Sequence, residues 1–215
     1  MKNIAIVLSG SGVYDGAEIH EATMTMLAIF QAGAKYQCFA PDVDQMHVIN
    51  HFTGKEMNES RNVLVESARI ARGDIKSLDE LDMKTFDALI FPGGFGAAKN
   101  LCSFAKDGPD CEVDNEVERV VKEAHSAKKP IGALCISPVI ITRVLGDVKV
   151  TIGTDPETIK AIDKMGGKHE TTTHGEVIID MENLVFTTPC YMLDANIGHI
   201  YDGAQAVVKE IMKHA

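Results

Sequence analysis

Cys135 follows a short apolar run, Ile131–Leu134, and stands shortly before Pro138. The run predicts a buried β-strand, and Pro138 suits the first turn of a helix. A cysteine between such a strand and such a helix occupies a nucleophile elbow above the edge of the sheet. The helix N-terminus would favour the thiolate there, so we expect a sulfur that is reactive near neutral pH. The other interpretation is a small buried hydrophobic residue.

Two glycine-rich segments follow other apolar runs. The segment Ser9–Gly16 leads to Glu18 and Glu21, and its glycines do not match the G-x-G-x-x-G pattern of dinucleotide sites, so we interpret it as a tight loop with positive φ. The segment Phe91–Gly96 contains the adjacent glycines Gly93 and Gly94. These can expose backbone N–H groups to a developing negative charge, or they can form a plain sharp turn.

Short β-branched runs alternate with amphipathic stretches along the whole chain. This alternation predicts an α/β fold, a mostly parallel central sheet flanked by helices. The expected strands are Ile4–Leu8, Tyr36–Ala40, Ala88–Phe91, Ile131–Leu134 and Leu184–Thr187. The expected helices are Glu18–Ala32, Asn115–Lys128, Asp155–Lys164 and Ala195–Lys213.

Capping residues set the expected helix ends. Asp15 followed by Glu18 resembles a capping box for the first helix, and Gly33 stands at its C′ position. Asp114 is the expected N-cap of the helix over 115–128. Residues 42–74 are more polar and form an excursion from the main sheet. We expect a single α/β domain over residues 1–215.

Composition excludes several classes of function. Lys and Arg number 21 and Asp and Glu number 31, so the net charge is −10, which disfavours binding to nucleic acids or to membrane surfaces. The five cysteines form no C-x-x-C pair, and we interpret them as reduced thiols of a cytoplasmic protein. No metal site is expected, and the spaced pair His47 and His51 is interpreted as surface histidines.

Several longer segments resemble the PfpI/ThiJ superfamily of class I glutamine amidotransferase-like proteins, and within it the ElbB branch of glyoxalases. The resemblance runs from Lys2 into the last helix and is carried by SGSGVYDGAEIHEA, CFAPD, VINHFTG, ESRNVLVESARIARGDI, FPGGFGAAKNL, TIGTD and TTPCYML. It implies a flavodoxin-like fold, a homodimer, no cofactor, and glyoxalase activity. The branch is also associated by name with isoprenoid (lycopene) biosynthesis.

The resemblance implies site residues as well. The nucleophilic cysteine of the family falls on Cys135, and its acid on the first helix falls on Glu21, with Glu18 as the competing candidate. The backbone N–H groups that hold the oxyanion fall on Gly94 and Ile136. Glu18 is also expected to serve the cap of its helix, whereas Glu21 lies a turn deeper, where burial and the neighbouring thiolate should raise its pKa.

The chain departs from the family at two positions. Ile136 stands where protease-like members carry a histidine, and the histidine of several other members would fall near Gly153 or Thr154. A Cys-His-acid triad is therefore not supported, and peptidase activity is not expected. An amidotransferase-type ammonia donor is also disfavoured, because that chemistry needs a histidine base and a synthase partner.

The remaining Cys–Glu pair predicts chemistry on small 2-oxoaldehydes, with glyoxal ahead of methylglyoxal. A thiolate adds to an aldehyde as a hemithioacetal, and a carboxyl group can then move a proton between adjacent carbons. For glyoxal this gives a thioester that water releases as glycolate, without glutathione or metal. A deglycase using the same site on aldehyde adducts is a related alternative. A redox-sensing or chaperone-like protein with an oxidisable Cys135 is an alternative of another class.

Overall fold

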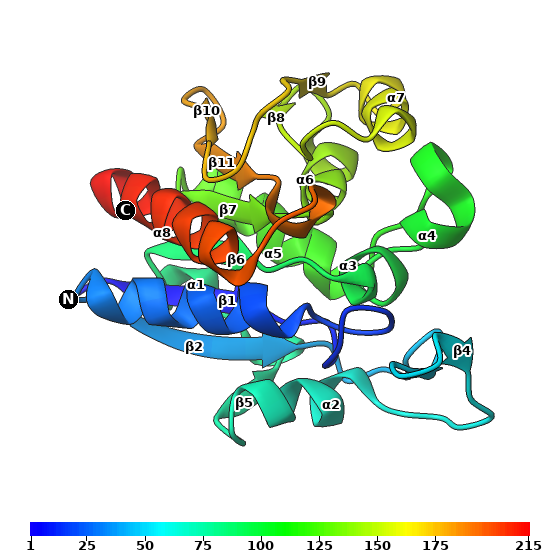
Figure 1. Cartoon of the computed structure of the whole chain (residues 1–215). Helices are drawn as coiled ribbons and strands as arrows, with labels where there is room; N and C mark the ends of the chain where they lie inside the picture. Colours follow the sequence, from blue (N-terminus) through cyan, green and yellow to red (C-terminus); the bar gives the residue numbers. More distant parts are fainter.

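The computed structural model describes all residues, Met1–Ala215, and is organised around a seven-stranded sheet (Figure 1). The strand order is β10-β11-β7-β6-β1-β2-β5, and only β10 runs antiparallel to its neighbour. The strands of this sheet are β1 Asn3–Val7, β2 Lys35–Ala40, β5 Ile75–Ser77, β6 Ala88–Phe91, β7 Ile131–Leu134, β10 Ile178–Asp180 and β11 Val185–Thr188. The expected α/β fold with a mostly parallel sheet is confirmed.

Helices and two small sheets complete the architecture. The α-helices are α1 Ile19–Gln31, α2 Val63–Ile70, α3 Phe95–Lys99, α4 Phe104–Asp107, α5 Asn115–Ser126, α6 Pro138–Leu145, α7 Pro156–Lys164 and α8 Ile197–His214. Two-stranded sheets pair β3 Ile49–Asn50 with β4 Lys55–Glu56, and β8 Lys149–Val150 with β9 Lys168–His169. Short 3-10 turns span Leu78–Glu80, Met83–Thr85, Gly108–Asp110 and Cys190–Met192. None of the helices is both long and apolar enough to cross a membrane.

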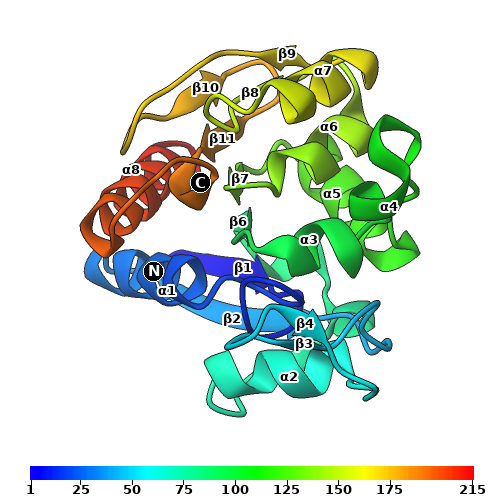
Figure 2. The ribbon, with the colours of Figure 1, turned by 45° about the vertical axis from the view of Figure 1, so that its right-hand side comes forward.

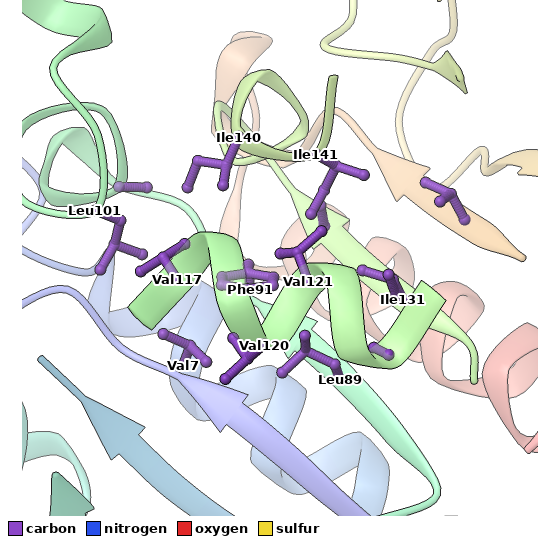
Figure 3. Packing of buried hydrophobic residues seen from close by; sticks show 14 of the residues in the cluster. Val7, Leu89, Phe91, Leu101, Val117, Val120, Val121, Ile131, Ile140 and Ile141 are labelled. Atoms are coloured by element: carbon purple, nitrogen blue, oxygen red, sulfur yellow. The ribbon is translucent and has the colours of Figure 1, made fainter. Parts of the chain in front are cut away.

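Helices cover both faces of the sheet, as the apolar character of the inner strands requires. On one face α5 and α6 pack on the sheet, and Figure 3 shows Val120 and Val121 of α5 above Val7, Leu89 and Phe91. On the other face α1 and α8 lie side by side (Figures 1 and 2). Because strand side chains alternate in direction, Ile4 and Ile6 of β1 point to the second face while Val7 points to the first.

The inner strands and the long helices lie within two residues of their expected bounds. The edge strands β5 and β10 were not expected, because each has only three residues and is partly exposed. The expected excursion over 42–74 contains the β3–β4 hairpin and α2, and α2 packs on the same sheet face as α1. Gly33 ends α1 with φ 74°, and Asp114 caps α5, both as predicted.

The expected cap of α1 is wrong. Glu18, not Asp15, is the N-cap residue, and its carboxylate accepts from the Glu21 N–H at 2.8 Å. Asp15 holds the excursion instead: its carboxylate accepts from the Ile49 N–H at 2.7 Å and lies 3.7 Å from His51 Nε2. Sequence spacing alone did not reveal that this long-range contact engages the Asp15 side chain.

The topology places three loops at one edge of the sheet. From β1 the chain runs outward to β2 and β5, then crosses back to β6 and continues outward to β7 on the other side, so the strand order reverses between β1 and β6. Ligands of open α/β sheets bind outside the carboxyl ends of the strands at such a switch point. The loops after β1, β6 and β7 therefore meet there, and they carry Ser9–Gly16, Pro92–Gly94 and Cys135.

Candidate active site

Cys135 lies at the sharp turn between β7 and α6, as predicted. Its backbone has a φ of 60°, a left-handed conformation that a residue with a side chain adopts only when its surroundings hold it there. Two contacts supply this restraint: the Cys135 N–H donates to the Thr188 carbonyl at 2.9 Å, and the Ser137 hydroxyl donates to the Pro92 carbonyl at 2.8 Å. The elbow is thus tied to the ends of both neighbouring strands, β11 and β6.

Glu21 comes from the first turn of α1 and is fully buried against the elbow. One carboxylate oxygen accepts from the Gly93 N–H at 2.9 Å, and the other accepts from the Tyr191 N–H at 3.2 Å. The Cys135 side chain lies beside this carboxyl group, because Cys135 Cβ and Sγ and Glu21 Oε2 all border the same space next to Gly93. Three segments that are distant in sequence therefore converge on one acid.

The close approach of these groups depends on Gly93. A β-carbon there would lie 2.3 Å from Cys135 Cβ and 2.6 Å from Glu21 Oε2, distances that no real side chain tolerates. The sequence left two interpretations of the segment Phe91–Gly96 open, exposed N–H groups or a plain sharp turn. The structure adds a steric role to these. The glycine pair removes a side chain at the point where the acid meets the thiol.

The surroundings of Glu21 favour its neutral form. Burial raises its pKa to about 8, and the neighbouring Glu18 charge adds to this effect, while the N–H groups of Tyr191 and Gly93 oppose it. The raised pKa was expected, although the second contribution was assigned to the thiolate rather than to Glu18. A carboxyl group with a pKa near neutrality suits proton transfer in either direction.

The expected thiolate is not what these surroundings favour. Burial and the Glu21 charge raise the pKa of the Cys135 thiol well above its usual value, and only the N–H groups of Gly94 and Ile136 act in the opposite sense. The N-terminus of α6 does not compensate for the loss of solvent and the adjacent carboxylate. The resting site holds a thiol, so the thiol proton must be taken up when the sulfur reacts.

Glu18, the competing acid, lies beside the pair but does not share its contacts. Its carboxylate caps α1 through the Glu21 N–H, and its own backbone N–H donates to the Gly93 carbonyl at 2.9 Å. The structure thus brings together Glu21, Gly94, Ile136 and Cys135 and leaves Glu18 with a helix-capping contact.

A cavity of about 430 Å³ opens above the Cys135 sulfur. Its walls are mostly apolar and include Phe95, Phe104 and Met192. Asp155 and Tyr191 contribute polar groups. This volume lies within the range of small-molecule sites, so the sulfur faces a space that can hold an organic ligand.

The family histidine would fall near Gly153 or Thr154. Gly153 has a φ of 87°, and a β-carbon at this position would lie 2.8 Å from Leu193 Cδ2, so a side chain there would be strained and would displace Leu193. The imidazole nearest to the cavity in the hydrogen-bond network is His20, whose Nδ1 lies 2.8 Å from the Tyr191 hydroxyl. No group of three or more His, Cys, Asp or Glu side chains forms a cluster that could hold a metal ion.

Comparison with known proteins assigns this arrangement to a family. The family model described as DJ-1/PfpI matches residues 12–189, a span that contains the α1 acid, the glycine pair and the elbow. The chain belongs to the DJ-1/PfpI family. Membership fits the class I glutamine amidotransferase-like fold and the strand–cysteine–helix elbow described above.

Curated relatives cover nearly the whole chain. The "ES1 protein homolog, mitochondrial" of Rattus norvegicus is 50% identical over 98% of this chain and 83% of its own length. The human "Glutamine amidotransferase-like class 1 domain-containing protein 3, mitochondrial" is also 50% identical, over 98% of this chain and 82% of its own. A crystal structure from Ehrlichia chaffeensis is 38% identical, with a TM-score of 0.94 over 100% of this chain and 99% of that one. It is described as an isoprenoid biosynthesis protein with an amidotransferase-like domain.

The names of these relatives correct one expectation. The rat and human proteins are named as mitochondrial, which contradicts the expected cytoplasmic location. That expectation used five unpaired cysteines, and all five are indeed free thiols. Free thiols indicate only a reducing compartment and do not distinguish one such compartment from another.

Sequence reasoning missed that the N–H group of Tyr191 donates to Glu21, and it expected the N–H groups of the Gly93–Gly94 pair to face developing charge, whereas that of Gly93 donates to Glu21. Backbone N–H groups carry no residue-type signal, so only the position of their segments could have indicated them. A signal was present for Tyr191, because it follows the expected strand Leu184–Thr187 and carboxyl ends of parallel strands meet at one edge.

Proposed function

We propose that this DJ-1/PfpI member is a cofactor-independent glyoxalase that converts 2-oxoaldehydes to 2-hydroxy acids. The observation that carries the proposal is the contact between the buried Glu21 carboxyl and the Cys135 thiol, with no histidine at the elbow. Such a pair provides a nucleophile and one group that can both accept and donate a proton. Those are the two functions that an aldehyde isomerisation through sulfur requires.

In the first step the sulfur adds to the aldehyde carbon. The Glu21 carboxylate accepts the Cys135 thiol proton, the sulfur–carbon bond forms, and the electron pair of the carbonyl bond moves to oxygen. The protonated Glu21 then gives its proton to that oxygen, which leaves a neutral hemithioacetal and a carboxylate. The N–H groups of Gly94 and Ile136, which contact the resting sulfur, are placed to hold negative charge during this step.

In the second step the same carboxylate moves a proton between the two carbons. Glu21 removes the hydrogen of the hemithioacetal carbon, which gives an enediolate with its charge on the neighbouring oxygen. The hydroxyl proton of the first carbon passes to that oxygen, and Glu21 returns its proton to the neighbouring carbon, which yields a thioester and restores the carboxylate. Water then attacks the thioester carbon, the sulfur leaves as the thiol, and glyoxal has become glycolate. One carbon is oxidised and its neighbour is reduced, so no external oxidant or reductant is needed.

In the active form of this scheme the Cys135 sulfur carries its proton and the Glu21 carboxyl group is ionised. Because the pKa of Glu21 is about 8, kcat/KM for glyoxal should rise with pH through that value in the wild type. Glu21→Gln should lack this rise, and Cys135→Ser should make no glycolate. If Cys135→Ser turned over glyoxal at the wild-type rate, the covalent mechanism would be contradicted.

A deglycase would use the same two groups on aldehyde adducts of amines and thiols. An adduct releases free aldehyde as it breaks down, so a glyoxalase acting on that aldehyde would also appear to consume the adduct. The two activities differ only if the adduct is turned over faster than it breaks down. Adduct turnover is therefore compared with the spontaneous release of aldehyde. A rate above spontaneous release would favour the deglycase.

The redox-sensor alternative receives less support from the site. A sensor needs an exposed thiolate, whereas Cys135 is buried and its thiol pKa is raised.

Assignment to the ElbB branch and a homodimeric state are further proposals. The Ehrlichia chaffeensis relative, with its isoprenoid description, supports the first, and light scattering of the purified protein tests the second.

A further inference from the structure

The cavity above Cys135 is much larger than glyoxal, one of the smallest dicarbonyl compounds. Its volume of about 430 Å³ leaves most of the space unfilled when an aldehyde carbon contacts the sulfur. Cavities that take organic ligands bury most of the ligand surface, so unfilled apolar walls indicate a missing substituent. What those walls are made of then decides which substituent fits.

The walls are apolar and include two aromatic rings. Phe95 of α3 and Phe104 of α4 line the cavity with Val13, Ile136 and Met192. Phe95 is half exposed in the empty protein, and covering it with an apolar group removes that surface from water. An apolar substituent on the substrate would therefore gain binding that glyoxal cannot.

The only charged side chain in the cavity lining is an acid. Asp155 caps α7, and its carboxylate accepts from the Thr158 N–H at 2.8 Å. No Lys, Arg or His lines this cavity. The nearby Lys99 lines a separate cavity, where its ammonium donates to the Tyr14 carbonyl at 2.8 Å. A negatively charged substituent would meet Asp155, and no cationic side chain in the lining would balance that charge.

We infer that the site takes neutral 2-oxoaldehydes that carry an apolar substituent, and that it disfavours both unsubstituted glyoxal and anionic 2-oxoaldehydes. This inference rests on the proposed glyoxalase function and specifies its substrate class. The substituent lies against Phe95, Phe104 and Met192, while the aldehyde carbon contacts the Cys135 sulfur. Asp155 acts as the group that rejects negative charge.

Three 2-oxoaldehydes that differ in substituent and charge test the inference by steady-state kinetics: glyoxal, isobutylglyoxal, and the anionic 4,5-dioxopentanoate. We expect kcat/KM for isobutylglyoxal to exceed that for glyoxal by about tenfold or more, the discrimination that a buried apolar group gives in a hydrophobic pocket. The dioxopentanoate should be the poorest of the three. A higher kcat/KM for glyoxal or for the dioxopentanoate would overturn the inference.

Asp155→Asn isolates the contribution of the charge, because asparagine also caps helices and should preserve α7. This variant should raise kcat/KM for the dioxopentanoate relative to isobutylglyoxal by about fivefold. Asp114→Asn changes the equivalent N-cap of α5, outside the cavity lining, and should leave the ratio unchanged. An equal change in both variants would contradict the role of Asp155.

A second measurement tests the cavity without relying on aldehyde turnover. Cys135 is alkylated with iodoacetamide, with its N-isobutyl derivative and with iodoacetate, and mass spectrometry follows each rate relative to free glutathione. The isobutyl reagent should be favoured, and iodoacetate should gain in Asp155→Asn. If no aldehyde is turned over but this order holds, the glyoxalase proposal fails while the ligand preference stands. The opposite order refutes the preference itself.

Discussion

Glu21 and Cys135 form a buried pair of neighbouring side chains in which ionisation of one group makes ionisation of the other harder. Glu21 is fully buried, and its two oxygens already accept from the N–H groups of Gly93 and Tyr191. The pair therefore titrates as a unit, and its apparent pKa values belong to both groups.

Replacing the acid should abolish turnover while the fold is retained. Glu21→Gln keeps the size of the side chain but cannot move a proton, so kcat with glyoxal should fall by about 10²–10⁴. Glu66→Gln is the matched control, because Glu66 is also a buried helical glutamate but pairs with Arg69 away from the cavity. Activity per folded molecule should be unchanged in this control. Circular dichroism checks that both variants are folded.

Removing the neighbouring charge should shift the pH profile without removing activity. The Glu18 carboxylate raises the pKa of Glu21, so Glu18→Gln should lower that pKa and move the rise in kcat/KM to lower pH. Glutamine keeps an oxygen that can accept from the Glu21 N–H but lacks the carboxylate charge, so the unfolding free energy should fall by no more than about 0.5–2 kcal/mol. If Glu18→Gln were stable and inactive while Glu21→Gln stayed active, the acid would have been assigned to the wrong helical turn.

The buried acid should make stability depend on pH. The pKa of Glu21 is about 8 in the folded protein and 4.5 as its ordinary value, so between these values the folded state binds more protons than the unfolded state. Unfolding free energy should then decrease as pH rises through this window, by at most about 1.4 kcal/mol per pH unit. Urea unfolding across the window measures this slope. Glu21→Gln should flatten it, and an equal slope in both proteins would contradict the raised pKa.

Adding one methyl group at Gly93 should break the pair. Gly93→Ala places Cβ within 2.6 Å of both Glu21 Oε2 and Cys135 Cβ, so the acid and the thiol must separate and activity should be lost. Gly132→Ala is the matched control in the neighbouring strand β7, where Cβ would meet Ile211 Cδ1 at 2.8 Å in the core. This control should lower the melting temperature yet keep activity per folded molecule. Equal losses of activity in the two variants would show that general destabilisation is responsible.

The inner strands and the elbow could be predicted because their signals are local. The run Ile131–Leu134 is apolar throughout, and Pro138 begins α6 as its restricted φ allows. The cap of α1 could not be predicted in the same way, since a distant N–H at Ile49 engages the Asp15 carboxylate. Short edge strands such as β5 carry too few residues for a periodic pattern.

The thiol state of Cys135 was predicted wrongly for a similar reason. A helix N-terminus is visible in the sequence, whereas complete burial beside a carboxyl group is visible only after folding. The N–H donors of Gly93 and Tyr191 are likewise products of topology, because the loops after β6 and β11 approach α1 only in the finished sheet.

The groups that position the acid are main-chain N–H groups, while the two aromatic rings of the cavity wall are side chains on the short helices α3 and α4. Exchanging Phe95 or Phe104 alters what the protein accepts but leaves these donors in place. Reactivity and selectivity are thus separable by mutation. A combinatorial library restricted to α3 and α4 would therefore change the ligands that the cavity binds while the contacts around Glu21 and Cys135 stay intact.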